Sequence, residues 1–192
     1  MSKIAIIVGN SMTGSYSEAL GLAYKRGAES GGHEARLFVL AQMNFDAILR
    51  EGYRRPQPLE PDLVAAREAL LACDHVVLIF PLWCGDMPAI LKGFLERVLQ
   101  PDLLKFQDSA GKADWKVFSG KSARVIMTMG MPGLIYRWFY GAHALKLLKR
   151  NILHFIGIRP VRSTLYGMIA AAGDEKRQQW LREVEALGHD AG

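Results

Sequence analysis

The sequence predicts a doubly wound α/β domain whose five parallel strands lie in the order 2-1-3-4-5. Apolar runs of strand length alternate with helical patterns along the whole chain. The third run, residues 76–80, contains no polar residue, which is typical of a strand that helices bury on both faces. A hydroxyl-rich turn follows the first run, and this strand order is the common arrangement when such a turn binds a monophosphate.

The first part of the chain supplies two strands with a helix between them. Residues 3–9 are a short apolar strand that ends in glycine, and residues 33–40 form the second strand. A capping box of Ser15 and Glu18 starts the intervening helix, which a pair of glycines ends. The segment 41–61 contains three prolines, so we expect an irregular loop whose basic residues face solvent.

The central strand lies between two helices. Residues 63–71 form the helix before it, with a proline near its start. Residues 81–87 after it predict a loop, because Pro81 cannot donate to a sheet ladder and Gly85 tolerates unusual backbone angles. The pattern then becomes helical over residues 88–98, with one apolar face.

The last part of the chain repeats the alternation after a polar connection. In this connection, residues 101–121, we expect Trp115 and Phe118 to lie at the edge of the domain. The remaining elements are a fourth strand over 122–129, an amphipathic helical segment over 134–153, a fifth strand over 155–166 and a closing helix over 174–187. The aromatic cluster in the helical segment belongs either to the core or to a dimer surface.

Length, composition and charge exclude several classes of protein. The 192 residues, half of them hydrophobic, suit one domain over residues 1–192. No segment reaches the roughly 18 apolar residues of a membrane span, so we expect a soluble, cytoplasmic protein without stable membrane insertion. Cys73 and Cys84 form neither a disulfide framework nor a metal-binding spacing. The net charge of +5 favours anionic small molecules, and no nucleic-acid signature is present.

The turn after the first strand is a candidate phosphate site. Ser11, Thr13, Ser15 and Ser17 bring hydroxyl and N–H groups to the positive end of a helix dipole. The alternative for Ser15 is a helix cap and nothing more. The sequence contains no G-x-x-x-x-G-K-[ST], no G-x-G-x-x-G in this turn and no G-x-S-x-G, so a monophosphate bound by hydroxyl groups remains.

Three motifs in the expected order resemble a known family. They are Ser15-Tyr16-Ser17, the stretch F-P-L-W followed by M-P-A-I-L-K-G and Arg97, and Thr128-x-Gly130 followed by Tyr136. The chain resembles the flavodoxin-like NAD(P)H:quinone oxidoreductases, the DT-diaphorase family, over nearly its whole length. The resemblance implies a flavodoxin-like homodimer with FMN or FAD, in which NAD(P)H delivers two electrons to a quinone or similar acceptor by a ping-pong cycle. The short chain favours FMN.

The same resemblance implies where the flavin lies. Its phosphate contacts fall on Ser11, Ser15, Tyr16 and Ser17, and its ring-edge contacts fall on Pro81, Leu82, Trp83, Cys84, Thr128, Met129 and Gly130. The chain departs from the family where Cys84, Gly85 and Asp86 replace a bulkier aromatic pair and where methionines replace residues of a T-T-G-G loop. We expect a more open substrate pocket from the first change, and fewer hydroxyl groups and a more adaptable apolar surface beside the ring from the second.

Two residues are catalytic candidates through the resemblance. Tyr136 matches a phenol placed near substrate and flavin, where it could donate a hydrogen bond to a quinone oxygen; the alternative is a tyrosine packed in the core. His143 lies one residue beyond the family's histidine position, which Ala142 occupies here. A relay through His143 and a solvent-facing helix histidine are both open.

Three other functions share this expected fold. A flavodoxin-type electron carrier usually has an acidic surface, which the basic composition disfavours. A regulatory flavoprotein subunit of a membrane transporter would have nearly the same sequence pattern. The third is an α/β binding module without flavin.

Overall fold

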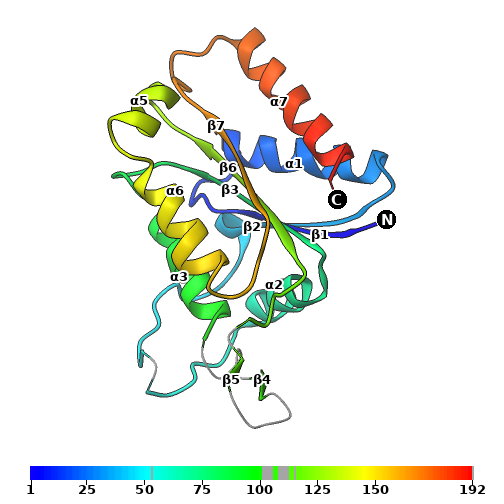
Figure 1. The fold of residues 1–192 in the computed structure, drawn as a ribbon, viewed down its shortest axis with the longest axis vertical. Helices are drawn as coiled ribbons and strands as arrows, with labels where there is room; N and C mark the ends of the chain where they lie inside the picture. The colour runs from blue at the N-terminus through cyan, green and yellow to red at the C-terminus, as the bar shows by residue number, and fades with distance from the viewer. Residues whose placement is uncertain (53, 101–105, 108–112, 115, 192) are drawn as a thin grey trace.

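The computed structural model describes residues 1–52, 54–100, 106–107, 113–114 and 116–191. Its main sheet has five parallel strands: β1 (Lys3–Val8), β2 (Glu34–Val39), β3 (His75–Pro81), β6 (Ser122–Thr128) and β7 (Val161–Tyr166). They lie in the order β2-β1-β3-β6-β7, so the predicted order 2-1-3-4-5 is confirmed (Figure 1).

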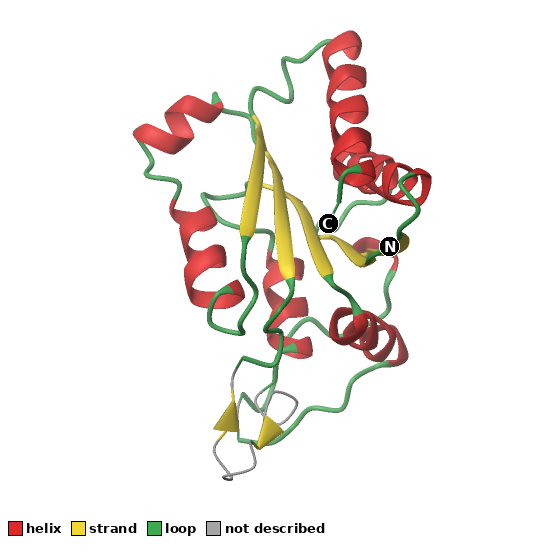
Figure 2. Cartoon of the chain, turned by 45° about the vertical axis from the view of Figure 1, so that its right-hand side comes forward, coloured by secondary structure: helices red, strands yellow, loops and turns green. Residues whose placement is uncertain are grey.

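Two layers of helices cover the sheet. On one face lie α1 (Tyr16–Ser30) and α7 (Asp174–His189). On the other lie α2 (Pro61–Ala72), α3 (Ala89–Val98) and α6 (His143–Leu147), which a π-helical turn, η2 (Leu148–Leu153), continues (Figures 1 and 2). A short 3₁₀ turn, η1 (Leu40–Gln42), follows β2, and α5 (Gly133–Trp138) follows β6.

The alternation of side chains along the central strands explains both layers. Successive side chains of a strand point to opposite faces, so Leu78 and Phe80 enter the core under α2 and α3, while Val77 and Ile79 enter the core under α1 and α7. All five of these central positions, Val76 included, are fully or almost fully buried. The unbroken apolar run was therefore a correct sign of a strand covered on both faces.

The structure differs from the expected elements in the last third of the chain. The fifth strand begins at Val161 rather than at residue 155, because Gly157 has a φ of +99° and Pro160 has no N–H for a sheet ladder. The expected helical segment over 134–153 is broken into α5, α6 and η2, since the chain turns at Gly141 and Ala142 with φ of +62° and +50°.

The polar connection before β6 also contains structure that the sequence did not predict. Its β4 (Phe106–Gln107) and β5 (Ala113–Asp114) form a small antiparallel sheet. Phe118 does not lie at the edge of the domain as expected: its side chain is buried in the core, and its N–H donates to the Ile156 carbonyl at 3.0 Å. Trp115 lies outside the described residues.

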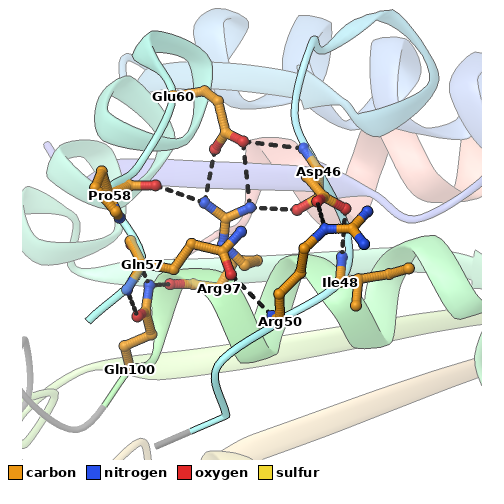
Figure 3. Close-up of polar contacts among 8 residues, drawn as sticks. All are labelled: Asp46, Ile48, Arg50, Gln57, Pro58, Glu60, Arg97 and Gln100. Atoms are coloured by element: carbon orange, nitrogen blue, oxygen red, sulfur yellow. Dashed lines mark hydrogen bonds and ion pairs between the residues drawn. The ribbon is translucent and has the colours of Figure 1, made fainter. Parts of the chain in front are cut away.

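The loop between η1 and α2 is anchored by Arg97 of α3. This side chain is fully buried, and Figure 3 shows its guanidinium between the loop and the start of α2. Its Nη2 donates to Glu60 Oε2 at 2.8 Å and to the Pro58 carbonyl at 2.7 Å, and its Nη1 donates to Glu60 Oε1 and to the Asp46 carbonyl. Arg54 and Arg55, at the outer part of the loop, are exposed as expected.

Gly93 lets the same loop approach α3. A Cβ at this position would lie 2.2 Å from the Ala47 carbonyl oxygen. At this distance no side chain fits unless the backbone moves. The glycine of the M-P-A-I-L-K-G motif thus has a packing role, and Gly93 and Arg97 hold α3 against residues 46–60.

Candidate functional site

Three loops meet at the carboxyl edge of the sheet. The Gly9 N–H after β1 donates to the Ile79 carbonyl of β3 at 2.8 Å. The Leu82 N–H after β3 donates to the Thr128 carbonyl of β6 at 2.7 Å, and the Met129 N–H after β6 donates to the Tyr166 carbonyl of β7 at 2.9 Å. The segments that the sequence singled out therefore emerge side by side, at the edge where open parallel sheets bind ligands.

The first loop, residues 9–15, is shaped by its own polar groups. The side-chain oxygen of the buried Asn10 accepts the Met12 N–H at 3.0 Å, and Gly14 adopts a φ of +65° that favours glycine. Ser15 is the N-cap of α1, since its Oγ accepts the Glu18 N–H at 3.3 Å. This part of the predicted capping box is confirmed.

The Glu18 carboxylate completes the cap in a way that the sequence did not predict. It accepts the Gly14 N–H at 2.8 Å rather than the Ser15 N–H, and its other oxygen accepts Gln42 Nε2 at 2.8 Å. The N–H groups of Ser15, Tyr16 and Ser17 consequently have no hydrogen-bond partner among the described residues. Free N–H groups at the positive end of a 15-residue helix are suited to an anion.

The side chains of this loop face different surroundings. Ser11 and Thr13 are exposed, whereas Ser17 is buried. The Tyr16 hydroxyl donates to the Arg177 carbonyl at 2.8 Å, and burial raises the pKa of Tyr16 to about 12 despite the nearby Arg177 charge. The Tyr16 side chain therefore joins the start of α1 to α7. The backbone N–H of Tyr16, by contrast, remains available to a ligand at the first loop.

The second loop is a tight turn at the end of β3. The Trp83 and Asp86 backbones exchange two hydrogen bonds, of 2.9 and 2.8 Å, across Cys84 and Gly85. Both central residues have positive φ, +48° for Cys84 and +80° for Gly85, as a type I′ turn requires. Pro81 belongs to β3, so the loop starts one residue later than predicted. Leu82 is half-buried, while the Trp83 side chain is 40% exposed and Cys84 is exposed.

The third loop is less polar than the second. Thr128 and Met129 are buried, and the Met129 side chain belongs to the core cluster under α3. The Met129 carbonyl accepts the Ile169 N–H at 3.1 Å, so both of its backbone groups are used within the protein. Gly130 is exposed and has open space where a Cβ would be.

The two catalytic candidates occupy different environments. Tyr136 is buried, and its hydroxyl accepts the Leu145 N–H at 3.2 Å in the first turn of α6. Burial raises the pKa of Tyr136 and outweighs the effect of the Leu145 N–H, while the Asp86 carboxylate raises it further. His143 is exposed at the start of α6, and its imidazole has no hydrogen bond to another described residue. The structure brings Tyr136 near the second loop and leaves His143 facing solvent.

Replacing Tyr136 by phenylalanine tests its capping role. The variant keeps the buried ring but leaves the Leu145 N–H without its acceptor, so we expect a loss of about 1 kcal/mol in the free energy of unfolding. Urea denaturation measures this loss. Tyr140→Phe, at a half-exposed tyrosine, is the control and should leave stability unchanged. Equal stability of both variants and the natural protein would contradict the capping role.

Two other kinds of feature are absent from the residues that the structure describes. No group of three or more His, Cys, Asp or Glu side chains in the described part of the chain could hold a metal ion. Across the same residues, none of the helices combines the length and the apolar character that crossing a membrane requires.

Comparisons with known proteins identify the family. A family model described as a flavodoxin-like fold matches residues 2–187. NAD(P)H dehydrogenase [quinone] 1 of Rattus norvegicus is 30% identical over 142 residues, which are 69% of this chain and 51% of the rat protein. This chain thus spans about half the length of that relative.

Two other proteins match over more of their length. An uncharacterized NAD(P)H oxidoreductase of Haemophilus influenzae is 25% identical over 93% of this chain and 89% of its own. The structure of an NAD(P)H:quinone oxidoreductase from Methanothermobacter marburgensis covers 98% of this chain and 95% of its own, with a TM-score of 0.80 and 22% identity. The resemblance found in the motifs is confirmed, and the chain belongs to the flavodoxin-like fold family.

Proposed function

We propose that this protein is a flavin-dependent oxidoreductase that transfers two electrons from NAD(P)H through FMN or FAD to a quinone or similar small acceptor. The observation that carries the proposal is the row of free N–H groups at Ser15, Tyr16 and Ser17, beside two further loops at the same edge of the sheet. The membership of the flavodoxin-like fold family and the relatives' names support it.

The residues of the three loops fit a flavin. The free N–H groups of the first loop, with the Ser11 and Ser17 hydroxyls, suit its phosphate. The N–H groups of Cys84 and Gly130 also lack a partner among the described residues, so they are available to the polar edge of a ring. The Trp83 side chain offers an apolar surface next to them. A bound flavin would supply a ring that takes a hydride from NAD(P)H and passes both electrons to the acceptor.

The backbone N–H groups without a partner in the protein are the ones that can act on such a ring. N–H donors near a group that gains negative charge stabilise that charge without having to reorganise. Cys84 and Gly130 are such donors, while Leu82, Trp83 and Met129 use their N–H groups within the protein. We therefore propose that the backbone N–H groups of Cys84 and Gly130 bind the polar edge of the ring. The other residues of the two loops would contact the ring by packing alone: Pro81, Leu82, Trp83, Thr128 and Met129.

Anaerobic stopped-flow reduction of the flavin-loaded protein tests the function. We expect NADPH or NADH to bleach the oxidised flavin band without a semiquinone, and a quinone to restore it. Bound flavin that NAD(P)H does not bleach would favour an electron carrier or a regulatory subunit. A protein that takes up neither FMN nor FAD would favour the binding module without flavin.

Replacing Ser17 by aspartate tests the phosphate loop. A carboxylate there faces the phosphate charge within a few ångströms, so we expect flavin affinity to fall at least about tenfold. Flavin fluorescence measures the affinity. Ser17 is buried, so Ser17→Ala provides a variant of the same loop without the charge, and circular dichroism checks folding. Ser119→Asp, at an exposed serine far along the chain, is the control. Unchanged affinity in a folded Ser17→Asp variant would remove this loop from the site.

We also propose that the exposed apolar side chains of α5 and the turn after it form a homodimer surface. Trp138 and Phe139 are 84% and 81% exposed, and Leu134 is 71% exposed. The aromatic cluster was expected either in the core or on a dimer surface. Tyr136 is in the core, whereas the other aromatic side chains of the cluster are exposed and could contact a partner. Patches of this kind mark interaction sites.

Trp138→Glu tests the dimer surface. A charge in the middle of an apolar interface should raise the dimer dissociation constant at least about tenfold. Light scattering after size-exclusion chromatography measures the mass of the natural protein and the variant. Leu22→Glu places the same charge at a half-exposed leucine of α1 and should not change the mass. A natural protein that runs as a monomer would contradict the proposal.

A further inference from the structure

A small cavity with several polar side chains in its walls lies at the amino edge of the sheet, opposite the three loops. Its volume is about 30 Å³, and its walls come from α1, β3, β6, β7 and the end of the chain after α7. The polar side chains that line it are Tyr24, His75, Ser122, Arg124, Arg162 and Asp190. His75 and Ser122 are the first residues of β3 and β6, which places the cavity away from the proposed flavin site.

Three of these side chains form a hydrogen-bonded row. His75 is buried; its Nε2 lies 3.3 Å from the Tyr24 hydroxyl and its Nδ1 lies 2.7 Å from Ser122 Oγ. Burial, with the charges of Arg124, Arg162 and His33, lowers the pKa of His75 to about 4. The ring is therefore neutral at pH 7, with one nitrogen donating and the other accepting.

Arg124 also lines this cavity. Burial raises the pKa of Tyr24, whereas the nearby charge of the Arg124 guanidinium lowers it. The hydroxyl of Ser122, a half-buried residue, lines the same cavity.

The two arginines add charge and donors to the same cavity. Arg124 and Arg162 are register partners on β6 and β7, so their side chains leave the sheet on the same face. Arg124 Nη1 donates to Thr164 Oγ1 at 3.2 Å, but Arg124 Nε is buried without a partner among the described residues. Arg162 is exposed to solvent.

The carboxylate of Asp190 does not neutralise this arrangement. Its side chain is 80% exposed and lies 3.0 Å from His189 Nδ1. Apart from this carboxylate, which faces solvent, the lining side chains offer the Ser122 hydroxyl group, a buried Nε–H and two guanidinium charges. At roughly 10–15 Å³ for each water, a volume of about 30 Å³ holds about two waters, and the cavity opens to solvent beside the exposed Arg162.

We propose that this cavity binds a small oxyanion, of the size and charge of inorganic phosphate, between Arg124, Arg162 and Ser122. The oxyanion accepts from the donors that the fold leaves unpaired, and it offsets the repulsion between two arginines directly opposite each other on neighbouring strands. Because it binds the folded protein, it raises the melting temperature in a saturable way.

Thermal unfolding of the flavin-loaded protein tests the site. Phosphate is titrated against chloride at constant ionic strength, and we expect a saturable rise in the melting temperature with phosphate. Arg162→Gln should weaken the apparent affinity at least about tenfold, since an exposed arginine can be replaced without disturbing the core. Arg124→Gln should do the same. Arg159→Gln removes the same charge from an exposed arginine that does not line the cavity, and it should leave the affinity unchanged.

A local signal separates this site from the phosphate loop of α1. The imidazole NMR resonances of His75 should shift during the same titration, because its Nδ1 is bonded to Ser122 Oγ. An unaltered His75 signal, or an unchanged phosphate affinity in Arg162→Gln, would mean that phosphate binds elsewhere and would overturn the proposal. An equal loss in Arg159→Gln would show only an attraction to surface charge and would overturn it too.

Discussion

Replacing Arg97 by methionine is expected to lower the free energy of unfolding by about 3 kcal/mol at pH 7, because removing one partner of a buried ion pair leaves the other uncompensated. The Arg97 side chain is fully buried, while that of Glu60 is 32% exposed, which keeps the loss below the upper end for such pairs. Methionine preserves the apolar stem but removes the Arg97 donors from the Glu60 carboxylate, which keeps the Asp46 N–H, and from the Pro58 and Asp46 carbonyls.

The loss should also depend on pH. Burial raises the pKa of Glu60, but the Asp46 N–H and the Arg97 guanidinium outweigh it and hold the pKa below the ordinary value. A carboxyl whose pKa is lower in the folded state stabilises the fold above its unfolded pKa and loses that contribution as the pH falls through the folded value. The difference between the natural protein and Arg97→Met should therefore be smaller at pH 3 than at pH 7.

Urea denaturation at both pH values measures this difference. Lys92→Met removes a charge from an exposed pair with Glu96 on the same helix and should cost little at either pH. A loss for Arg97→Met that is as small as that of Lys92→Met would show that the loop over 46–60 does not depend on this guanidinium. A loss of the same size at pH 3 and pH 7 would show that Glu60 is not the partner that matters.

The sheet could be predicted from the sequence because its strands are local patterns. The apolar run over 76–80 is buried on both faces as predicted, and the order of strands follows from the alternation with helices. The place of Arg97 could not be predicted in this way. Its partners, Glu60 and Asp46, are 37 and 51 positions away in the sequence, and nothing in the pattern of α3 specifies them.

The candidate site was predictable to a similar degree. The hydroxyl-rich turn and the glycine in the second loop pointed to the carboxyl edge of the sheet, where both loops lie, because turn chemistry is local. The αL conformation of Cys84 was not visible, since a cysteine seldom adopts it and the exchange of hydrogen bonds between Trp83 and Asp86 sets it. The Tyr136 hydroxyl was assigned to substrate by resemblance, but its contact with the Leu145 N–H depends on the turn at Ala142, which broke the expected helix.

Replacing Gly27 by alanine is expected to destabilise the fold by about 2 kcal/mol, although alanine is the better helix former by about 1 kcal/mol. A Cβ at Gly27 of α1 would lie 1.8 Å from the Glu185 carbonyl oxygen of α7, and one at Gly188 of α7 would lie 2.2 Å from the Tyr24 carbonyl oxygen. The two helices thus contact each other backbone to backbone, and the obstacle is a carbonyl that cannot change rotamer.

The direction of the stability change shows whether helix packing or helix propensity dominates at Gly27. Gly133→Ala is the matched control, because it lies in α5 with nothing within 4 Å of its Cβ, and it should be neutral or slightly stabilising.

Since α1 also carries the proposed phosphate loop, and its Tyr16 hydroxyl bonds to Arg177 of α7, pushing the helices apart should weaken flavin binding as well as lower stability. A Gly27→Ala protein as stable as Gly133→Ala would mean that α1 and α7 separate without cost. Lost stability with unchanged flavin affinity would mean that the first turn of α1 is held by its own loop and not by α7.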